Sequence, residues 1–306
     1  MINKIILGSD RPPVTLDENG NERRIILSHI GEEFAEGSPA PSMPDEKIWR
    51  GSMAASCSRQ IAYRICDTEP TNPLTGADFW RFGLGTLVHN QLKPAIDNWL
   101  EKETDIRADE EMEVELGDYG YGHIDLTLST IVDGKVDKRI VVELKTINGT
   151  GFKKAIGGEG PRHSALVQGA MYANAVDADL LIICYLTMEL LSPSYATAKG
   201  FDNTGRFGAE WHFTKEEFTP IAEAEINRLD WITESLVTWD GDEAVLKEAT
   251  EIPKMFSEYD PDIPWGAEIT DPSTGAWMLE EDGSLLGKGR TWMCNYCQYQ
   301  DRCVSE

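Results

Sequence analysis

The sequence lacks long apolar runs and has few cysteines. No apolar stretch in its 306 residues approaches the roughly 18 that a membrane-spanning helix needs, so no membrane partner is expected. The opening segment, residues 1–8, is too short for a secretory signal, which predicts a cytoplasmic location. Six cysteines are no disulfide scaffold in a chain of this length, and clustered thiols in a reducing compartment more often hold a metal.

Positive charge is also scarce. Lys and Arg number 28 against 53 Asp and Glu, and the net charge of −25 argues against non-specific nucleic-acid binding by the whole surface. One stretch departs from this balance, because residues 135–162 hold seven Lys or Arg and three Asp or Glu. A local basic stretch beside metal-binding carboxylates is suited to a phosphate backbone. Charge alone, however, favours an ordinary solvent-exposed hairpin and loop.

Hydrophobic periodicity and turn residues predict an α/β chain. Helices are expected over residues 52–67, 78–103, 163–176 and 214–238, and strands over 112–116, 122–128, 140–147 and 180–186. Ser52 and Thr214 are the expected N-caps, the latter with Glu217 in a capping box. Asp133-Gly134 predicts a hairpin turn. A flexible loop is expected at 149–161, a loop or hairpin at 191–210, and a peripheral extension at 1–46.

Two predicted strands carry the residues that phosphodiester hydrolysis requires. Asp125 is expected opposite the apolar face formed by Ile124, Leu126 and Leu128, and Glu143 and Lys145 share one face of the next strand. Hydrolysis needs a divalent cation on oxygen ligands, an activated water and positive charge near the developing phosphorane. Asp125, Glu143 and the Leu144 carbonyl suit Mg²⁺ or Mn²⁺. Lys145 can stabilise the transition state.

Three helical residues extend this set. His89 can complete the metal shell, where a nitrogen ligand favours Mn²⁺ over Mg²⁺. Gln168 and Tyr172 are four residues apart, so they share a helix face. The alternative is structural, because a helix histidine is more often no ligand and Glu-x-Lys is common on solvated strands. Unpaired charge is costly in an apolar strand, and this cost favours a functional role for Glu143 and Lys145.

Four cysteines near the two ends of the chain form a second candidate site: Cys57, Cys294, Cys297 and Cys303. The Cys-x2-Cys pair within the C-terminal three is a chelating turn that suits zinc or an iron–sulfur cluster. Four thiolates on one centre would fasten the C-terminus to the first helix and reduce the freedom of the unfolded chain. Cys66 and Cys184 are expected to be buried thiols outside this set.

These motifs resemble the PD-(D/E)xK nuclease superfamily, and within it the RecB-like iron–sulfur nucleases, which include the AddB-type nuclease domain and the CRISPR-associated Cas-four family. The matching segments follow the family's order: the helix with Cys57, Gly83-x-Gly85-x3-His89, Gly122-His-Ile-Asp125, Glu143-Leu-Lys145, Gln168-x3-Tyr172 and the C-terminal Cys-x2-Cys-x5-Cys. The resemblance covers residues 52–188 and 290–303.

The resemblance implies a fold, a cofactor and an activity. The fold is α/β, a central mixed sheet flanked by helices as in restriction endonucleases, spanning 47–306 with an insertion at 190–288. A 4Fe–4S cluster would join the N- and C-terminal segments, with zinc as the runner-up. The implied activity is a Mg²⁺- or Mn²⁺-dependent DNA exonuclease acting on ends or single strands in recombination, repair or replication. The implied catalytic residues are Asp125, Glu143, Lys145, Gln168 and Tyr172.

The implied setting is a prokaryotic cell or a virus-infected host cell, and two other readings stay open. One is a non-catalytic DNA-end or protein-binding module of the same fold, which the net charge favours and the complete motif set opposes. The other is a CRISPR spacer-processing nuclease, which the length of the chain opposes. No Gly-x4-Gly-Lys-Ser/Thr motif occurs, so unwinding would require a helicase or recombination partner. Lys153, Lys154 and Arg162 are the candidate DNA-binding residues.

Overall fold

The computed structural model describes residues 14–16, 22–24, 48–201, 204–240, 243–246, 248, 249, 252, 297–299 and 302. The chain divides into two compact units, residues 1–42 with 73–87 and residues 43–72 with 88–306. In the first unit, β1 (Val14–Leu16) and β2 (Glu22–Arg24) pair in antiparallel orientation. Helix α3 (Gly76–Leu100) begins in the first unit and ends in the second.

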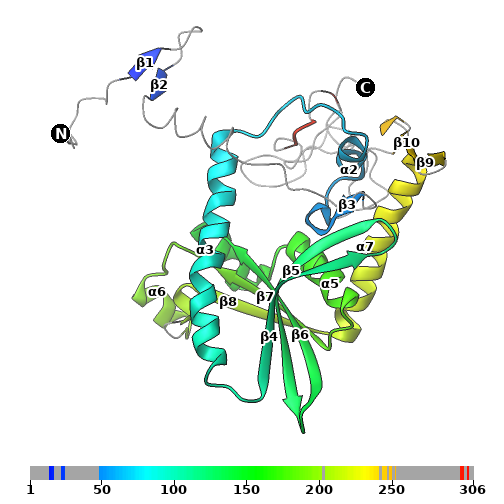
Figure 1. Cartoon of the computed structure of the whole chain (residues 1–306). Helices are drawn as coiled ribbons and strands as arrows, with labels where there is room; N and C mark the ends of the chain where they lie inside the picture. Colours follow the sequence, from blue (N-terminus) through cyan, green and yellow to red (C-terminus); the bar gives the residue numbers. More distant parts are fainter. Residues whose placement is uncertain are drawn as a thin grey trace, which may run out of the picture. The chain divides into compact units, whose positions relative to one another are not determined.

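The larger unit is built on a six-stranded mixed sheet (Figure 1). Its strands are β3 (Trp49–Arg50), β4 (Ile106–Leu116), β5 (Gly120–Val132), β6 (Lys135–Thr146), β7 (Leu180–Leu186) and β8 (Gly208–Thr214). Strands β4, β5 and β6 are antiparallel neighbours, whereas β7 runs parallel to β6 and β8 runs antiparallel to β7. The predicted mixed sheet is therefore confirmed, and β8 places part of the predicted insertion inside it.

The turn between β5 and β6 follows the predicted hairpin chemistry. Asp133 and Gly134 have φ angles of 51° and 75°, so both central residues of this two-residue turn are left-handed. Such a turn matches the twist of the flanking strands. The turn thereby sets the antiparallel alignment of the two strands that carry Asp125 and Glu143.

One face of the sheet is covered by α5 (His163–Ala175) and α7 (Lys215–Leu236). Both helices were predicted, and α7 begins with the expected capping box, in which the Thr214 N–H donates to Glu217 Oε2 at 2.8 Å. A Cβ at Gly169 would lie 2.8 Å from Ile183 Cδ1. Glycine at this position therefore lets α5 pack directly on β6 and β7.

The opposite face packs against the second half of α3. Leu92 and Ile96 of this helix contact a cluster of Leu126, Val142 and Leu144. Ile124 instead lies in the core beneath α5 and α7. The prediction that Ile124 and Leu126 share one face is therefore wrong, because the two side chains belong to different hydrophobic clusters and β5 changes neighbours between them.

The predicted helix from Ser52 is wrong at its start. A short 3-10 helix, η1 (Gly51–Met53), comes first, and α2 (Ser58–Ile65) follows it. Ala55, with a left-handed φ of 56°, interrupts the helical path. Its N–H donates to Glu225 Oε1 of α7 at 2.7 Å, so a tertiary contact replaces the helical hydrogen bond.

The segment 149–161 is helical rather than a loop, so this prediction is also wrong. It forms α4 (Gly149–Lys154) and a π-helical turn, η2 (Ala155–Glu159). Asn148 caps α4 by accepting a hydrogen bond from the Gly151 N–H at 2.7 Å, and Phe152 is fully buried. The glycines suggested flexibility, but a capped N-terminus and one buried aromatic side chain order the segment.

Short elements occupy much of the remaining described chain. Residues 191–210, predicted as a loop or hairpin, include α6 (Pro193–Ala198) and η3 (Thr204–Arg206) before β8 begins. Strands β9 (Val237–Asp240) and β10 (Glu243–Leu246) pair in antiparallel orientation. Most of the predicted extension, and most of the predicted insertion beyond residue 246, lie outside the described residues.

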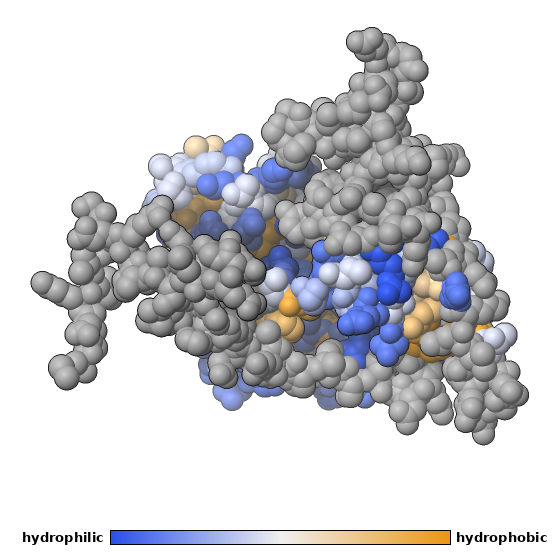
Figure 2. Space-filling view, turned by 90° about the horizontal axis from the view of Figure 1, so that it is seen from above, coloured by the Kyte–Doolittle hydropathy of each residue, from blue (hydrophilic) through white to orange (hydrophobic). Residues whose placement is uncertain are grey.

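Hydrophilic and hydrophobic residues lie next to one another on the described surface in the view of Figure 2. Among the helices that the structure describes, none has the length and apolarity of a membrane span.

Candidate functional site

The candidate site lies on β5, at the point where the strand paired along one of its edges changes from β3 to β6. Strand β4 pairs with β5 along the other side, from Leu116 to Ile106. On the open side, β3 pairs only with residues 120–121, and pairing with β6 begins at Leu126. Residues 122–125 therefore lie between two strand pairings. A break of this kind exposes backbone polar groups that side chains must satisfy.

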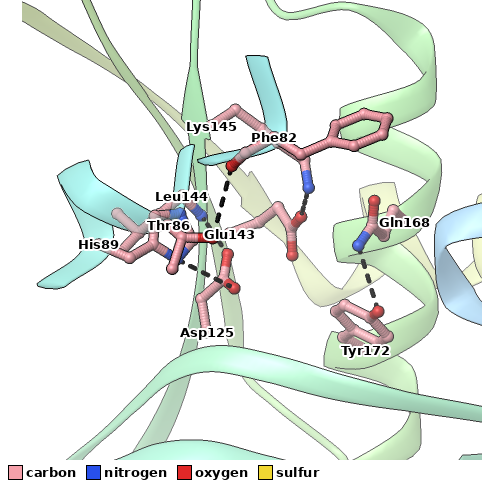
Figure 3. A network of polar contacts seen from close by, with 9 residues as sticks. All are labelled: Phe82, Thr86, His89, Asp125, Glu143, Leu144, Lys145, Gln168 and Tyr172. Carbon is pink, nitrogen blue, oxygen red and sulfur yellow. Dashed lines mark hydrogen bonds and ion pairs between the residues drawn. The ribbon is translucent and has the colours of Figure 1, made fainter. Parts of the chain in front are cut away.

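Asp125 and Tyr172 satisfy backbone groups at this break. The Leu144 N–H donates to Asp125 Oδ2 at 2.9 Å (Figure 3). The carboxylate thus takes the place of the β5 backbone carbonyl that would accept this hydrogen bond if β5 and β6 remained paired here. The His123 N–H donates to the Tyr172 hydroxyl. The opening in the sheet is thus held by two side chains that the sequence predicted to be functional.

Glu143 is buried at this opening beside Lys145. Its side chain is 1% exposed, and Oε1 forms an ion pair with Lys145 Nζ (Figure 3). Apart from this ion pair, neither carboxylate oxygen has a hydrogen-bond partner among the described residues. Buried carboxylate oxygens normally have such partners. A bound cation would satisfy the free lone pairs of these buried carboxylate oxygens.

The pKa values of Glu143 and Lys145 respond differently to burial and to the charges around them. Burial raises the pKa of Glu143 to about 7, against the lowering effect of the Lys145 charge, while the nearby Asp125 charge raises it further. Burial alone would lower the pKa of Lys145, but the Glu143 and Asp125 carboxylates outweigh this effect and raise it. The ammonium therefore stays charged at neutral pH, whereas the carboxyl titrates near it.

His89 approaches the same carboxylate cluster from α3. Its Nδ1 lies 3.8 Å from Asp125 Oδ1, and the two side chains are 36% and 22% exposed. Across the described residues, no three His, Cys, Asp or Glu side chains come close enough to hold one metal ion together. The predicted ligands are thus arranged as two pairs, His89 with Asp125 and Glu143 with Lys145.

The donor set nevertheless fits a divalent cation chemically. Two carboxylates and one imidazole are available, and both oxygens of Glu143 have capacity to spare. Oxygen donors suit Mg²⁺ or Mn²⁺, and an imidazole nitrogen shifts the preference towards Mn²⁺. The Leu144 backbone lies between Glu143 and Lys145, with its N–H already bound by Asp125.

Tyr172 is held more tightly than the sequence indicated. The side chain is 3% exposed, and its hydroxyl accepts a hydrogen bond from Gln168 Nε2 at 3.1 Å. A Cβ at Gly51 or Gly122 would lie 2.6 or 2.4 Å from the tyrosine ring. Burial raises the pKa of Tyr172, which keeps the hydroxyl neutral. Tyr172 therefore positions α5 against β5, and the half-buried Gln168 is the more accessible of the two.

Tyr185 is a further site residue that the sequence reasoning missed. It lies on β7 directly opposite Lys145 and is 1% exposed. Its hydroxyl accepts a hydrogen bond from the Arg162 N–H at 2.6 Å, which links β7, the neighbour of the Glu143 strand, to the start of α5. The signal was present in the sequence, because a hydroxyl within an apolar strand needs a buried partner.

The predicted DNA-binding cations are exposed. Lys153 and Lys154 are in the last turn of α4, and Arg162 is the residue before α5. Lys153 Nζ lies 5.9 Å from the centre of the Tyr195 ring, beside a pocket of about 280 Å³ that Glu189 also lines. Since α4 begins soon after β6 ends at Thr146, these cations follow the strand that carries Glu143 and Lys145.

Two of the four cluster cysteines fall within the described residues. Cys57 precedes α2 at its N-cap, and the segment that begins at Cys297 packs near the same helix. The rings of Tyr63 and Tyr299 lie 5.0 Å apart, and the Asn72 N–H donates to the Gln298 carbonyl at 2.8 Å. Cys294 and Cys303 lie outside the described residues, so the four-thiolate centre stays a prediction.

The two remaining cysteines are half-buried. Burial raises the pKa of Cys184 to about 12 and also raises the pKa of Cys66. Cys184 packs against the Leu126, Val142 and Leu144 cluster, in agreement with its predicted packing role.

Comparisons with known proteins give structural likeness only. No protein-family model matches the chain, and no curated protein sequence matches it. Similar solved structures include SSO0001, with 19% identity, a TM-score of 0.43 and coverage of 69% of this chain and 85% of that one. An alkaline exonuclease from Laribacter hongkongensis has 13% identity, a TM-score of 0.37 and coverages of 62% and 91%.

A phage-related exonuclease from Haemophilus somnus has 10% identity, a TM-score of 0.29 and coverages of 49% and 70%. At these TM-scores, the likeness establishes neither a shared family nor a shared activity.

Proposed function

We propose that this chain is a divalent-metal-dependent DNA nuclease. The observation that carries the proposal is the buried Glu143 carboxylate, whose oxygens lack hydrogen-bond partners among the described residues at a break in the sheet. Asp125 lies close enough to affect the pKa of Glu143, and Lys145 forms an ion pair with it. A purely structural role for the ion pair would not explain why Asp125, Glu143 and Lys145 gather at the break in the sheet.

Each side chain has a distinct role in the proposed site. Asp125 and Glu143 would hold a Mg²⁺ or Mn²⁺ ion, with His89 and the Leu144 carbonyl as further ligands. When bound, the cation would polarise the phosphodiester and activate a water molecule. The Lys145 ammonium, 35% exposed, stabilises negative charge that develops on the phosphate oxygens. Gln168 is placed to orient the substrate, while Tyr172 fixes the helix that carries it.

The exonuclease assignment and the RecB-like relationship are part of the same proposal. Their support is the ordered set of motifs from Cys57 to Cys303, which the sequence shares with that family. DNA ends or single strands are the proposed substrates, contacted by Lys153, Lys154 and Arg162 through their exposed charges. A helicase or recombination protein is the proposed partner for duplex unwinding.

The decisive test is degradation of end-labelled DNA. Anaerobically purified protein is incubated with single- and double-stranded DNA in Mn²⁺, Mg²⁺ or chelator. Metal-dependent loss of label is expected in the wild type and not in Glu143→Gln or Lys145→Met. The matched control is Glu113→Gln, which removes an exposed carboxylate from β4 and leaves the proposed site intact. Full activity in both site variants would overturn the proposal.

The iron–sulfur centre is a separate proposal with its own test. We infer that Cys57, Cys294, Cys297 and Cys303 hold a 4Fe–4S cluster, supported by the packing of the Cys297 segment near α2. Anaerobic protein should absorb near roughly 400 nm, as thiolate-bound iron does. Cys57→Ala should lose this absorbance and Cys184→Ala should keep it. If the protein is colourless and contains stoichiometric zinc, the four cysteines hold zinc instead of iron. Protein that contains neither iron nor zinc would overturn the proposed centre.

A non-catalytic nucleic-acid-end or protein-binding module is the second candidate function. It is favoured by the arrangement of the described ligands in two pairs rather than around one point, and by the net charge of −25. Protein that binds DNA ends without hydrolysis, in the presence of Mn²⁺ and an intact cluster, would establish this function instead. Equal binding by Glu143→Gln would then be expected, because the carboxylate would have no catalytic role.

A further inference from the structure

A second polar pocket lies towards the C-terminal end of α5. Its volume is about 690 Å³, and its lining includes Arg107, Thr127, Ser129 and Arg139. Val176, which follows α5, lines it as well. Arg139 precedes Glu143 on β6 by four residues, about 13 Å along an extended strand. Arg139 therefore lies away from the carboxylate site, whereas Thr127, two residues from Asp125 on β5, lies at the end of the pocket towards that site.

The sheet register places two arginines on either side of one serine. Arg107 of β4 pairs with Ser129 of β5, and Ser129 pairs with Arg139 of β6. Directly paired residues project from the same face of a sheet, and neighbouring strands lie about 4.8 Å apart. The two arginine Cα atoms are thus about 10 Å apart across Ser129, so both guanidinium groups can reach one anion above it.

Two buried hydroxyl groups form the floor of this pocket. Ser129 is 8% exposed and Thr127 is 2% exposed. Thr127 Oγ1 has no hydrogen-bond partner among the described residues, although it is buried. An unpartnered buried hydroxyl costs free energy, and the oxygen of a bound ligand would satisfy it. This is an observation independent of the arginine pair.

The charged side chains that line the pocket are two arginines and one aspartate. Arg139 Nη1 donates to the Val176 carbonyl, which holds the guanidinium at the wall of the pocket. Arg107 is exposed and forms no ion pair with a described residue. Asp109 also lines the pocket, so two guanidinium groups accompany one carboxylate in a protein of net charge −25. Asp177 and Asp179 also lie beside Arg139, so it is the donor groups of the lining, and not an excess of charge around the pocket, that favour an anion.

We propose that this pocket binds a phosphate group. Two guanidinium forks and two hydroxyls supply more donors than a carboxylate has oxygens, whereas a phosphate can accept from all of them. Leu100 and Met112 add an apolar wall that suits a sugar or base attached to the phosphate. The phosphate comes either from a free mononucleotide or from a nucleic-acid backbone. The site does not depend on the nuclease proposal, because none of its residues is assigned to hydrolysis.

The test measures binding without catalysis, on full-length protein in chelator. Phosphorus NMR and thermal stabilisation report binding of inorganic phosphate, a 5′-deoxynucleoside monophosphate and a single-stranded oligonucleotide without terminal phosphates. Arg107→Gln should weaken phosphate binding about tenfold or more, as the loss of a charge-assisted hydrogen bond predicts. Ser129→Ala should weaken it less. Lys138→Gln is the matched control, because it removes one charge from the neighbouring position of β6, which projects to the opposite face.

Each outcome bears on the pocket separately from the nuclease. Stronger binding of the mononucleotide than of the oligonucleotide would assign a free nucleotide as the ligand, and the reverse would assign a backbone phosphate. Equal affinities in the wild type and in folded Arg107→Gln and Ser129→Ala would overturn the site. An equal loss in Lys138→Gln would also overturn it, by showing only a general charge effect. Cleavage of DNA by Arg107→Gln in Mn²⁺ tests the other site independently.

Discussion

Glu143 and Lys145 form an ion pair between two positions of one strand, although one side chain is 1% exposed and the other 35%. The ammonium therefore connects a buried carboxylate with solvent. Because Lys145 reaches solvent, its charge is screened and has a smaller desolvation cost than that of Glu143. The pair is asymmetric, and removing either partner has a different consequence.

Lys145→Met should destabilise the protein at pH 8 in chelator. The substitution leaves the Glu143 carboxylate buried without its cation, and the pKa of Glu143 should rise above about 7. The loss should be about 1–2 kcal/mol, less than for a fully buried pair because Lys145 is partly exposed. Denaturant unfolding measures the change.

The double variant Glu143→Gln/Lys145→Met tests this reasoning. With both charges removed, it should be more stable than Lys145→Met alone at pH 8, because no uncompensated charge remains. Additive losses in the two single variants would show that the partners do not interact energetically.

Glu143 should also make stability depend on pH in metal-free protein. Its folded pKa of about 7 lies above the ordinary 4.5, so between these values the folded state retains a proton that the unfolded state has lost. Rising pH therefore destabilises the fold in this range, by up to about 3 kcal/mol, and the contribution is constant above it. Unfolding free energies from pH 4.5 to 8 measure the slope.

Glu143→Gln should flatten this part of the pH profile, because glutamine does not titrate. Glu113→Gln, which changes an exposed carboxyl, should retain it. An unchanged profile in Glu143→Gln would mean that another group sets the pH dependence.

The sequence predicted the site residues through local patterns. Glu143 and Lys145 are two apart in an apolar strand, and period-two alternation was sufficient to place them on one face. Gln168 and Tyr172 are four apart, which predicted a shared helix face, and the structure adds a hydrogen bond between them. Strand β7 and the capping box of α7 were predicted for the same reason, because the responsible signals lie within a few residues of one another.

The missed features depend on contacts between distant segments. Ala55 leaves the helical path because its N–H binds Glu225, 170 residues away. Tyr185 enters the site through its pairing with Lys145, which only the sheet register reveals. The glycines near α4 predicted a loop, but burial of Phe152 determines the outcome. Local sequence therefore predicted which side chains share a face of one element better than it predicted the contacts between distant segments that hold them.

Asp125 should have separable structural and functional roles. Asp125→Ala leaves the Leu144 N–H without its acceptor and should cost about 1–3 kcal/mol. Asp125→Asn keeps a side-chain oxygen in reach of this N–H and should cost less. Both variants remove the charge, so both should lose stabilisation by Mn²⁺ if the proposed metal site is correct. Thermal unfolding with and without Mn²⁺ separates the two effects, and an Asn variant that still gains Mn²⁺ stabilisation would remove Asp125 from the ligand set.

Gly122→Ala should disturb the site without changing a polar group. The new methyl group would lie 2.4 Å from Tyr172 Cε1, and the ring is held by hydrogen bonds from Gln168 and His123. Because the ring cannot move freely, we expect a loss of about 1–3 kcal/mol. Gly157→Ala is the matched control, since its Cβ would meet nothing within 4 Å. If denaturant unfolding shows equal stability for both variants, Tyr172 is free to shift and does not position α5 as the contacts indicate.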